Sequence, residues 1–329
     1  MQEERAMPTR KVGRSGRPPR SPLPDRRLLE QQMTAITRLL AEREFASLEE
    51  ANAYLQETLA SGGLPVVAPT TPLEEAQEVI YQALEAQGTR RLELARTALT
   101  ISPDCADAYV LLAEAAANAQ EARRLYAQGV QAGERALGQA AFTEEVGHFW
   151  GIVETRPYMR ARQGLATVLW HLGERREALA HLHDMLRLNP DDNQGLRYLL
   201  AGWLLAVGDD AALDLLLAAY PDEGSAQWAY TRALAAFRRQ GAGPEADRAL
   251  RRALRANPHV PLYLLGATPF PLHPPDSYGS GDEHEAVIYL AEAAEGWLET
   301  PGAPEWLSTV LQRTRPSASA APRRRPRRS

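Results

Sequence analysis

Apolar residues recur at helical spacing along most of this chain. In residues 28–44 they fall on one face of a helix with about 3.6 residues per turn, at Leu29, Met33, Ile36, Leu39 and Leu40. A second helix is predicted to begin after Ser47, because Glu50 follows three residues later and such a pair can cap the first backbone N–H groups of a helix. These two helices are predicted to form a small N-terminal hairpin over residues 28–60.

The segment that follows interrupts the helical pattern. Residues 61–72 read SGGLPVVAPTTP, in which glycine and proline disfavour a helix. Thr71, Pro72 and Glu74 then supply an N-cap, a first-turn proline and an acidic residue, which together favour a new helix start. Residues 61–72 are therefore predicted to link the hairpin to a larger helical body at 73–312.

Prolines and glycines in the larger body recur with a period close to 34 residues. Pro190 and Pro258 are 68 residues apart, which is two periods, and Gly173, Gly208 and Gly241 are separated by 35 and 33 residues. A period of about 34 is typical of the tetratricopeptide repeat, in which two antiparallel helices form each unit. Proline stops the second helix, and glycine permits the turn between the two.

The side chains between these markers fit the same repeat. The residues that would pack inside three successive units are Leu165, Ala166, Leu169, Ala178, Leu182 and Met185, then Leu200, Ala201, Leu204, Leu213 and Leu217, then Ala233, Leu234, Phe237, Ala246, Leu250 and Ala253. Small residues let two helices approach closely, and larger ones fill the remaining space. An earlier unit ends at Pro103, 87 residues before Pro190. Two periods leave about 19 of these residues over, so an insertion or an elongated helix pair is expected near 129–157.

The pattern as a whole predicts an all-α protein. Its body is expected to be a tetratricopeptide-like α-solenoid, a right-handed superhelix of about four to five antiparallel helix pairs. Residues 1–27 carry eight Lys or Arg against three acids, and residues 313–329 carry seven Arg and no acid, so both are predicted to be disordered basic tails. Without the tails, 37 basic and 42 acidic residues become 22 and 39, and the body is acidic.

Three short blocks resemble a known family. They are ARTALTISPDCADAYVLLAE at 95–114, ALRANPHVPLYLLG at 253–266 and GDEHEAVIYL at 281–290. These blocks resemble the corresponding parts of the suppressor-of-tumorigenicity-seven family, and the likeness extends over about residues 95–300. The resemblance implies tetratricopeptide-like repeats. It implies no catalytic residues, because none is established for that family.

Cysteine use and hydropathy favour a cytoplasmic location. Cys105 is the one cysteine, so no disulfide can form within the chain, and a reducing compartment is expected. The longest mostly apolar run, residues 198–207, is about half the length of a membrane-spanning helix. We expect no membrane contact and no bound cofactor.

Histidines give only weak candidates for metal chemistry. His148 and Glu154 are six residues apart and His171 lies further on, so the spacing of a helical zinc site is absent. His181 and His183 are two residues apart and would point about 200° away from each other on a helix.

Two other candidates leave both a chemical and a structural interpretation open. The loop at 273–285 contains two His and four acids, which could hold a cation or could simply precede a capped helix. Cys105 follows Pro103 and Asp104 at a predicted helix start, where a thiol could be reactive or could simply be packed. A metal-dependent enzyme is the weakest hypothesis, and the protein is expected not to be an enzyme.

The favoured function is an intracellular protein–protein interaction scaffold that binds a peptide or protein partner in the concave groove of its superhelix. Counting along the repeats places nine side chains on the helices that would line this groove: Arg160, Gln163, Trp170, His171, Tyr198, Trp228, Thr231, Arg238 and Arg239. Arginine and aromatic side chains anchor many interfaces, and the arginines would favour acidic groups or a C-terminal carboxylate.

Two alternatives remain beside this hypothesis. Around the expected insertion, Phe149, Trp150 and Tyr158 could merely fill space, and Glu154, Arg156 and Arg162 could form ion pairs. The basic tails could also make weak, sequence-independent contacts with nucleic acid, although the acidic body opposes this.

The repeat register makes one substitution diagnostic. Ala178→Trp should destabilise the protein by about 1–3 kcal/mol or more, because that position needs a small side chain where two helices touch. Thermal unfolding measures the effect. An unchanged melting temperature would show that Ala178 is exposed and that the register is wrong.

Overall fold

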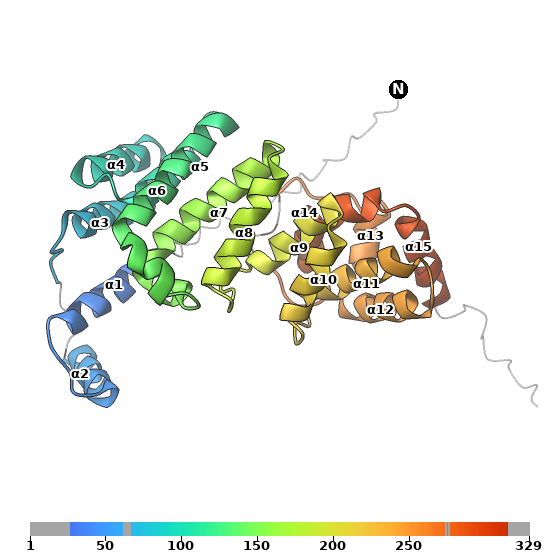
Figure 1. The fold of residues 1–329 in the computed structure, drawn as a ribbon, viewed down its shortest axis with the longest axis horizontal. Helices are drawn as coiled ribbons and strands as arrows, with labels where there is room; N and C mark the ends of the chain where they lie inside the picture. The colour runs from blue at the N-terminus through green and yellow to red at the C-terminus, as the bar shows by residue number, and fades with distance from the viewer. Residues whose placement is uncertain (1–26, 62–66, 274, 276, 315–329) are drawn as a thin grey trace, which may run out of the picture.

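The computed structural model describes residues 27–61, 67–273, 275 and 277–314, and all regular secondary structure in these residues is helical (Figure 1). The α-helices are α1 (Leu28–Ala41), α2 (Leu48–Ala60), α3 (Pro72–Glu85), α4 (Gly88–Ile101), α5 (Ala106–Glu114), α6 (Ala119–Glu144), α7 (Arg156–His171), α8 (Arg175–Leu188), α9 (Leu196–Val207), α10 (Asp210–Ala219), α11 (Ala226–Gln240), α12 (Pro244–Ala256), α13 (Val260–Leu264), α14 (Glu283–Glu299) and α15 (Ala303–Thr314). Two short 3₁₀ turns, η1 (Phe149–Gly151) and η2 (Val153–Thr155), precede α7. The prediction of an all-α fold is confirmed.

Ten of these helices pack in consecutive pairs, each made of two neighbours along the chain. The pairs are α3 with α4, α5 with α6, α7 with α8, α9 with α10, and α11 with α12. Neighbouring pairs touch through α5 and α7, α8 and α9, and α10 and α11. The predicted α-solenoid is therefore present, with five helix pairs among the described residues.

The packing residues expected from the 34-residue period lie inside these pairs. Every one of the seventeen residues assigned to the three units is at most 9% exposed. Gly173 and Gly208 take positive φ angles of 84° and 74° where the two helices of a pair meet, a conformation that costs glycine little. The repeat therefore sets the helix contacts as well as the helix boundaries.

The expected insertion takes the form of a long, kinked helix followed by two tight turns. Helix α6 has 26 residues and is interrupted by non-helical Gly138, with φ 73° and ψ 165°. The turns η1 and η2 then bring the chain back to α7. Rings of Phe142, Phe149 and Tyr158 pack together here, with centroids 5.1 to 6.2 Å apart. Phe149 and Tyr158 fill the space that the longer connection opens.

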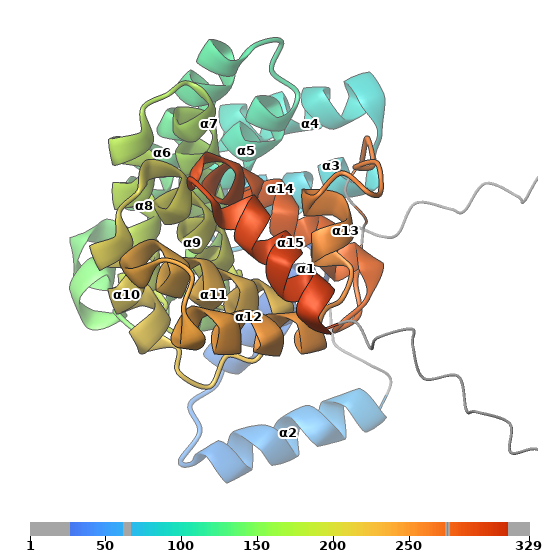
Figure 2. The same ribbon diagram turned by 90° about the vertical axis from the view of Figure 1, so that its right-hand side faces the viewer.

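Helices α1 and α2 do not form the hairpin expected from the sequence. Helix α1 packs against α3 and η2, whereas α2 buries no residue. Figure 2 shows α2 standing apart from the other helices. A capped start at Ser47, whose hydroxyl accepts from the Glu50 backbone N–H at 3.2 Å, begins α2. The Tyr54 ring of α2 packs on Phe45 in the connection before it, with centroids 5.5 Å apart.

The buried face of α1 also differs from the apolar stripe expected for it. Glu30 and Arg38 are 6% and 9% exposed, and Leu39 beside them is buried. Leu29 and Met33, expected in the core, are 63% and 37% exposed. Ion pairs with the body orient α1 more strongly than burial of its N-terminal apolar residues.

Helix α14 occupies part of the concave face of the solenoid. It packs on α9 and α11, the first helices of two consecutive pairs, and Figure 2 shows α8, α10 and α12 further toward the outside. The sequence gives a capped helix at this position but no indication that it returns to the groove. The C-terminal half of the expected groove is therefore filled by the chain's own helix.

Two glycines allow α9 and α14 to approach closely. A Cβ atom at Gly202 would lie 2.6 Å from the carbonyl oxygen of Glu292, and one at Gly296 would lie 2.6 Å from the Cβ of Leu205. Neither position has room for a methyl group without a shift of the backbone. Helix α14 is thus fitted to α9 by reciprocal contacts.

Several expectations fall on residues outside the described part of the chain. They concern residues 1–26 and 315–329, which make up nearly all of the two basic tails, and residues 62–66 within the linker. Among the helices that the structure does describe, none combines the length and the apolar character needed to cross a membrane.

The α9–α14 contact generates a stability prediction. Gly202→Ala and Gly296→Ala should each lower the free energy of unfolding by about 1–3 kcal/mol, because overpacking outweighs the better helix propensity of alanine. Urea unfolding provides the measurement, with Gly224→Ala as the control because no atom lies within 4 Å of a Cβ there. Equal stabilities for all three variants and the wild type would contradict close packing of α14 in the groove.

Candidate partner-binding site

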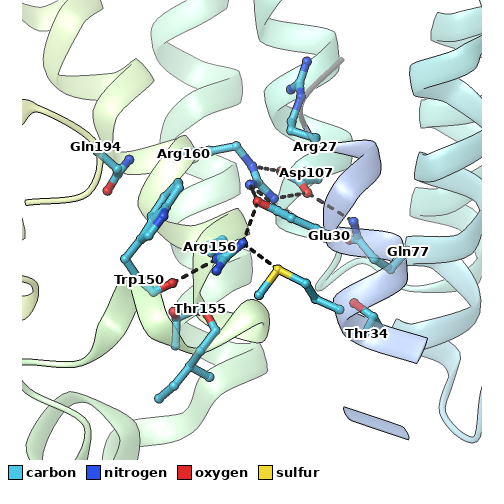
Figure 3. A network of polar contacts seen from close by, with 12 residues as sticks. Arg27, Glu30, Thr34, Gln77, Asp107, Trp150, Thr155, Arg156, Arg160 and Gln194 are labelled. Atoms are coloured by element: carbon cyan, nitrogen blue, oxygen red, sulfur yellow. Dashed lines mark hydrogen bonds and ion pairs between the residues drawn. The ribbon is translucent and has the colours of Figure 1, made fainter. Parts of the chain in front are cut away.

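Helix α7 carries Arg160 into a buried ion network that ties three distant segments together. Its guanidinium donates to Asp107 of α5 in a two-pronged contact, from Nε at 2.9 Å and from Nη2 at 2.6 Å. Nη1 donates to both carboxylate oxygens of Glu30 in α1, at 2.8 and 2.9 Å. Figure 3 shows Arg160 between the two carboxylates. Arg156, one turn earlier in α7, also reaches Glu30.

Because the charged groups of this network are buried, the network depends on each of them having a partner of opposite charge. Asp107 is 1% exposed, and the side chains of Glu30 and Arg160 are 8% and 12% exposed. Burial alone would raise the pKa of Asp107, but the charge and hydrogen bonds of Arg160 lower it below its usual value. Burial would likewise lower the pKa of Arg160, yet Asp107 and then Glu30 raise it. Asp107 and Arg160 therefore stay charged while they remain together.

Three polar residues on one face of α1 continue these contacts along the helix. Glu30, Thr34 and Arg38 follow each other at intervals of four residues, so they lie one above another. The Thr34 hydroxyl is 3.2 Å from that of Tyr81, and Arg38 Nη1 donates to Glu78 at 2.7 Å. Helix α1 is thus attached to the body by a row of polar contacts.

A cavity of about 190 Å³ lies beneath α1. Its walls come from α1, α3, α6, the η2 turn and α7, and include Thr37, Leu73, Gly133, Val153 and Pro157. Arg38 also lines it, and its Nη2 atom is buried without a hydrogen-bond acceptor in the described structure. A dry cavity of about 150 Å³ holds a benzene ring in another protein, so this one has room for a single ring-sized group.

An open hollow of about 290 Å³ lies on α5, α6 and α7, and we call it the α5–α7 hollow. It is lined by Val110, Glu114, Tyr126, Arg160, Gln163, Gly164, Thr167 and Val168. Tyr126 lies directly over Gly164, where an added Cβ would come within 2.2 Å of its ring. The first helices of two neighbouring pairs therefore share a hollow that no helix of the described chain fills.

A pair of side-chain amides lies at one side of this hollow. Gln194 Nε2 donates to Gln163 Oε1 at 3.0 Å, and Gln194 Oε1 is buried without a donor. An amide side chain offers donors and an acceptor like those of a peptide backbone. Gln163 lines the hollow and can therefore hydrogen-bond to the main chain of another segment, whereas Gln194, whose Oε1 is buried, holds the Gln163 amide in place.

The structure leaves three of the nine sequence-predicted residues beside open surface on α7. Gln163 lines the hollow, Trp170 is half-buried and His171 is exposed. The Trp170 ring stacks on that of Trp203, with centroids 4.5 Å apart. The guanidinium carbon of Arg175 lies over the Trp170 ring, 4.8 Å from its centroid. His171 Nδ1 is 2.8 Å from the Thr167 carbonyl oxygen.

The other six residues do not share one open groove with these. Trp228 and Thr231 are 0% and 2% exposed, and with half-buried Tyr198 they face Tyr289, Glu292 and Ala293 of α14 across a small internal gap. Arg160 is committed to the ion network described above. Arg238 donates to the Leu205 carbonyl oxygen at 2.9 Å, and exposed Arg239 pairs with Asp214 at 2.5 Å. The described structure does not bring all nine residues together at one open surface, because α14 packs over α9 and α11.

The weak chemical candidates from the sequence have structural partners. Burial, and then the charge of Asp107, raises the pKa of the Cys105 thiol to about 12, so the thiol is held protonated. His181 Nδ1 accepts from Arg162 Nε at 3.2 Å. Arg162 also pairs with Asp184. No group of three or more His, Cys, Asp or Glu among the described residues is arranged to hold a metal ion.

In the described part of the 273–285 loop, Asp282 and Glu285 accept hydrogen bonds around the start of α14. Asp282 accepts from the backbone N–H groups of Glu285 and Gly279, at 2.8 and 2.6 Å. Glu285 is 1% exposed and accepts from the Ala226 N–H at 3.1 Å and the Asn257 amide at 3.0 Å. Residues 274 and 276 of this loop lie outside the described part.

Sequence reasoning missed the acids that neutralise Arg160. Asp107 lies among buried Ala106, Ala108 and Val110, and a charged residue inside a run of core positions signals a buried partner. Glu30 carries no such signal, because its neighbours along α1 are a mixture of exposed and half-buried residues. Gln194 was also missed, since it lies in the turn before α9 and outside the repeat pattern.

The network predicts a large difference between two aspartates. Asp107→Asn should cost about 3–5 kcal/mol of unfolding free energy, because it leaves buried Arg160 with a single carboxylate. The matched change Asp214→Asn breaks an exposed pair with Arg239 and should cost at most about 1 kcal/mol. Urea unfolding at neutral pH measures both.

The same pair predicts a pH dependence. Because the folded pKa of Asp107 is lowered, its stabilisation is complete above the unfolded value of about 3.9 and is lost as pH falls through the folded value. The difference between wild type and Asp107→Asn should therefore shrink below about pH 4. A constant difference down to low pH would contradict an ionised, paired Asp107.

Comparisons with known proteins identify the family of this chain. The model of the family described as "ST7 protein" matches residues 67–319. The "Suppressor of tumorigenicity 7 protein-like" of Rattus norvegicus is 31% identical over 247 residues, which cover 68% of this chain and 44% of that protein. The "Protein ST7 homolog" of Drosophila pseudoobscura pseudoobscura is 29% identical over 255 residues, covering 70% of this chain and 47% of that protein.

A solved structure, "Crystal structure of YrrB: a TPR protein with an unusual peptide-binding site", matches with a TM-score of 0.37 at 19% sequence identity, covering 67% of this chain and 91% of that chain. The chain spans less than half the length of the curated relatives given above. The family match covers all the helix pairs from α3 to α12 as well as α14 and α15. By this match the chain belongs to the ST7 protein family.

Proposed function

We propose that this protein is an interaction scaffold that binds an extended peptide segment of a partner protein in the α5–α7 hollow. The observation that carries the proposal is the position of this hollow on the concave face. Helix α1 is attached at one side through Glu30, and α14 fills the groove on α9 and α11 at the other. The hollow between them is a part of that face that the helices of the described residues leave open.

The chemistry of the hollow suits a peptide main chain better than a charged ligand. Gln194 donates to Gln163 Oε1 and so orients the Gln163 amide, which keeps donor capacity toward the hollow. Arg160 is already paired with two carboxylates, so an acidic group from the partner would gain little from it. We therefore propose backbone recognition by the Gln163 amide, and not the acidic recognition that the arginines suggest from sequence.

Side-chain selection would come from the apolar parts of the same surface. Val110, Tyr126 and Val168 offer contacts for one apolar side chain of the peptide. Trp170 and His171 lie two turns further along α7 than Gln163 and would contact residues that follow in the peptide. The cavity beneath α1 has a separate set of lining residues, and the proposed site does not include it.

Filling the hollow should abolish binding without unfolding the protein. Thr167 is half-buried in the hollow, and its hydroxyl donates to the Gln163 carbonyl oxygen at 3.0 Å. Peptides should first be selected from a random library on the full chain and their dissociation constants measured by fluorescence polarisation. Thr167→Trp should then weaken binding at least about tenfold, which corresponds to about 1.4 kcal/mol.

A matched control separates loss of the site from loss of the fold. Thr97 is exposed on α4 and also donates to the carbonyl oxygen four residues earlier, at 3.0 Å. Thr97→Trp should bind the selected peptides like the wild type, and both variants should keep the wild-type melting temperature. Selected peptides that bind Thr167→Trp and Thr97→Trp equally would refute the site.

A further inference from the structure

Helix α12 presents a row of arginines on the surface opposite its core face. Its buried residues Ala246, Ala249, Leu250 and Ala253 follow the spacing i, i+3, i+4 and i+7. Arg248, Arg251, Arg252 and Arg255 repeat that spacing two residues later, about 200° around the helix. We call these four residues the arginine stripe.

The arginine stripe is mostly unpaired within the described part of the chain. Arg251 is 3.8 Å from Asp247, a carboxylate that also accepts from the Trp306 indole at 2.8 Å. Arg248, Arg252 and Arg255 are exposed and have no hydrogen bond or ion pair with any described residue. Like charges three and four residues apart on a helix repel each other, so the stripe weakens α12 until an anion neutralises it.

An apolar hollow adjoins the stripe where α12 meets α15. Figure 2 shows these two helices side by side. It has a volume of about 330 Å³ and is lined by Arg251, Leu254, Arg255, Pro258, Leu311 and Thr314. Leu254 and Leu311 are half-buried, so they offer an apolar surface between two guanidinium groups. We call it the α12–α15 hollow.

From these observations we propose that α12 and α15 form a second interaction surface, which binds an acidic amphipathic helix of a partner protein. Carboxylates three and four residues apart on that helix match the stripe, because both follow the same helical spacing. One large apolar side chain of the partner enters the α12–α15 hollow. The body outside the tails carries 39 acidic against 22 basic residues, so the stripe stands out by its sign as well as its pattern.

The surroundings favour an acidic protein segment over nucleic acid. Binding of single-stranded nucleic acid relies on exposed aromatic rings for base stacking, and none of the residues that line the α12–α15 hollow is aromatic. Trp306 of α15 is 5% exposed and stacked on Phe237, so it is not available for a base. An apolar hollow between arginines can bury a leucine side chain, whereas a phosphate backbone has no apolar group to place there.

The test uses the full chain and a fluorescein-labelled helical peptide with Glu along one face and Leu on the adjoining face. Fluorescence polarisation should give a saturable isotherm whose affinity falls as salt is added. The variant Arg252→Glu/Arg255→Glu should weaken binding at least about tenfold. The control Arg90→Glu/Arg96→Glu changes two exposed arginines of α4 by the same charge and should bind like the wild type. Residues 1–26 and 315–329 are identical in all three proteins, so any contact they make with the peptide cancels in the comparison.

A second peptide, in which Gln replaces Leu, tests the hollow. It should bind the wild type several-fold more weakly and should differ less between wild type and the α12 variant. Equal affinity of the two peptides, or equal binding by the two double variants, would overturn the proposal. So would tighter stripe-dependent binding of a mixed-sequence oligonucleotide, or stripe-dependent self-association in sedimentation, because each identifies a different occupant.

Discussion

The close contact between α9 and α14 determines what the rest of the concave face can do. Gly202 and Gly296 let the two backbones approach so closely that a single added methyl group would collide with the opposite helix. Because α14 lies against the first helices of two consecutive pairs, it removes Trp228 and Thr231 from the surface. A repeat solenoid usually offers one long groove, and this contact shortens it to the part on α5 and α7.

At the other end of this open part of the groove, α1 is held in place by ion pairs instead of close helix packing. A buried pair of ions gains little over apolar residues of the same shape, but breaking it is expensive, so it specifies a position more than it adds stability. Arg160 is paired with both Asp107 and Glu30, and α1 can satisfy that arrangement only when Glu30 is seated over α7. This explains how α1 docks with its polar face inward while Leu29 and Met33 remain exposed.

The sequence predicts local features well and contacts between distant segments poorly. The 34-residue period correctly identified Ala178, Leu182 and Leu250 as packing residues, because small and large side chains at fixed positions are needed wherever two helices of a pair touch. It also located the irregular connection before α7. The period could not show that α14 returns to the groove, because that contact joins residues about 90 positions apart through glycines that leave no apolar pattern. Glu30 and Asp107 were missed for a related reason, since their partner on α7 is 130 and 53 residues away.

The two proposed surfaces differ in how they would discriminate between partners. The α5–α7 hollow offers the Gln163 amide and apolar side chains beside an arginine that is already neutralised, so its selectivity would depend on shape and backbone hydrogen bonds. The arginine stripe offers unpaired charge on an exposed helix, where screening by salt is strong and association is accelerated by attraction. The hollow would therefore set which segment is held, and the stripe would set how fast an acidic partner arrives. Since α12 and α7 belong to helix pairs that are separated by the α9–α10 pair, one partner with two motifs or two separate partners could occupy them at once.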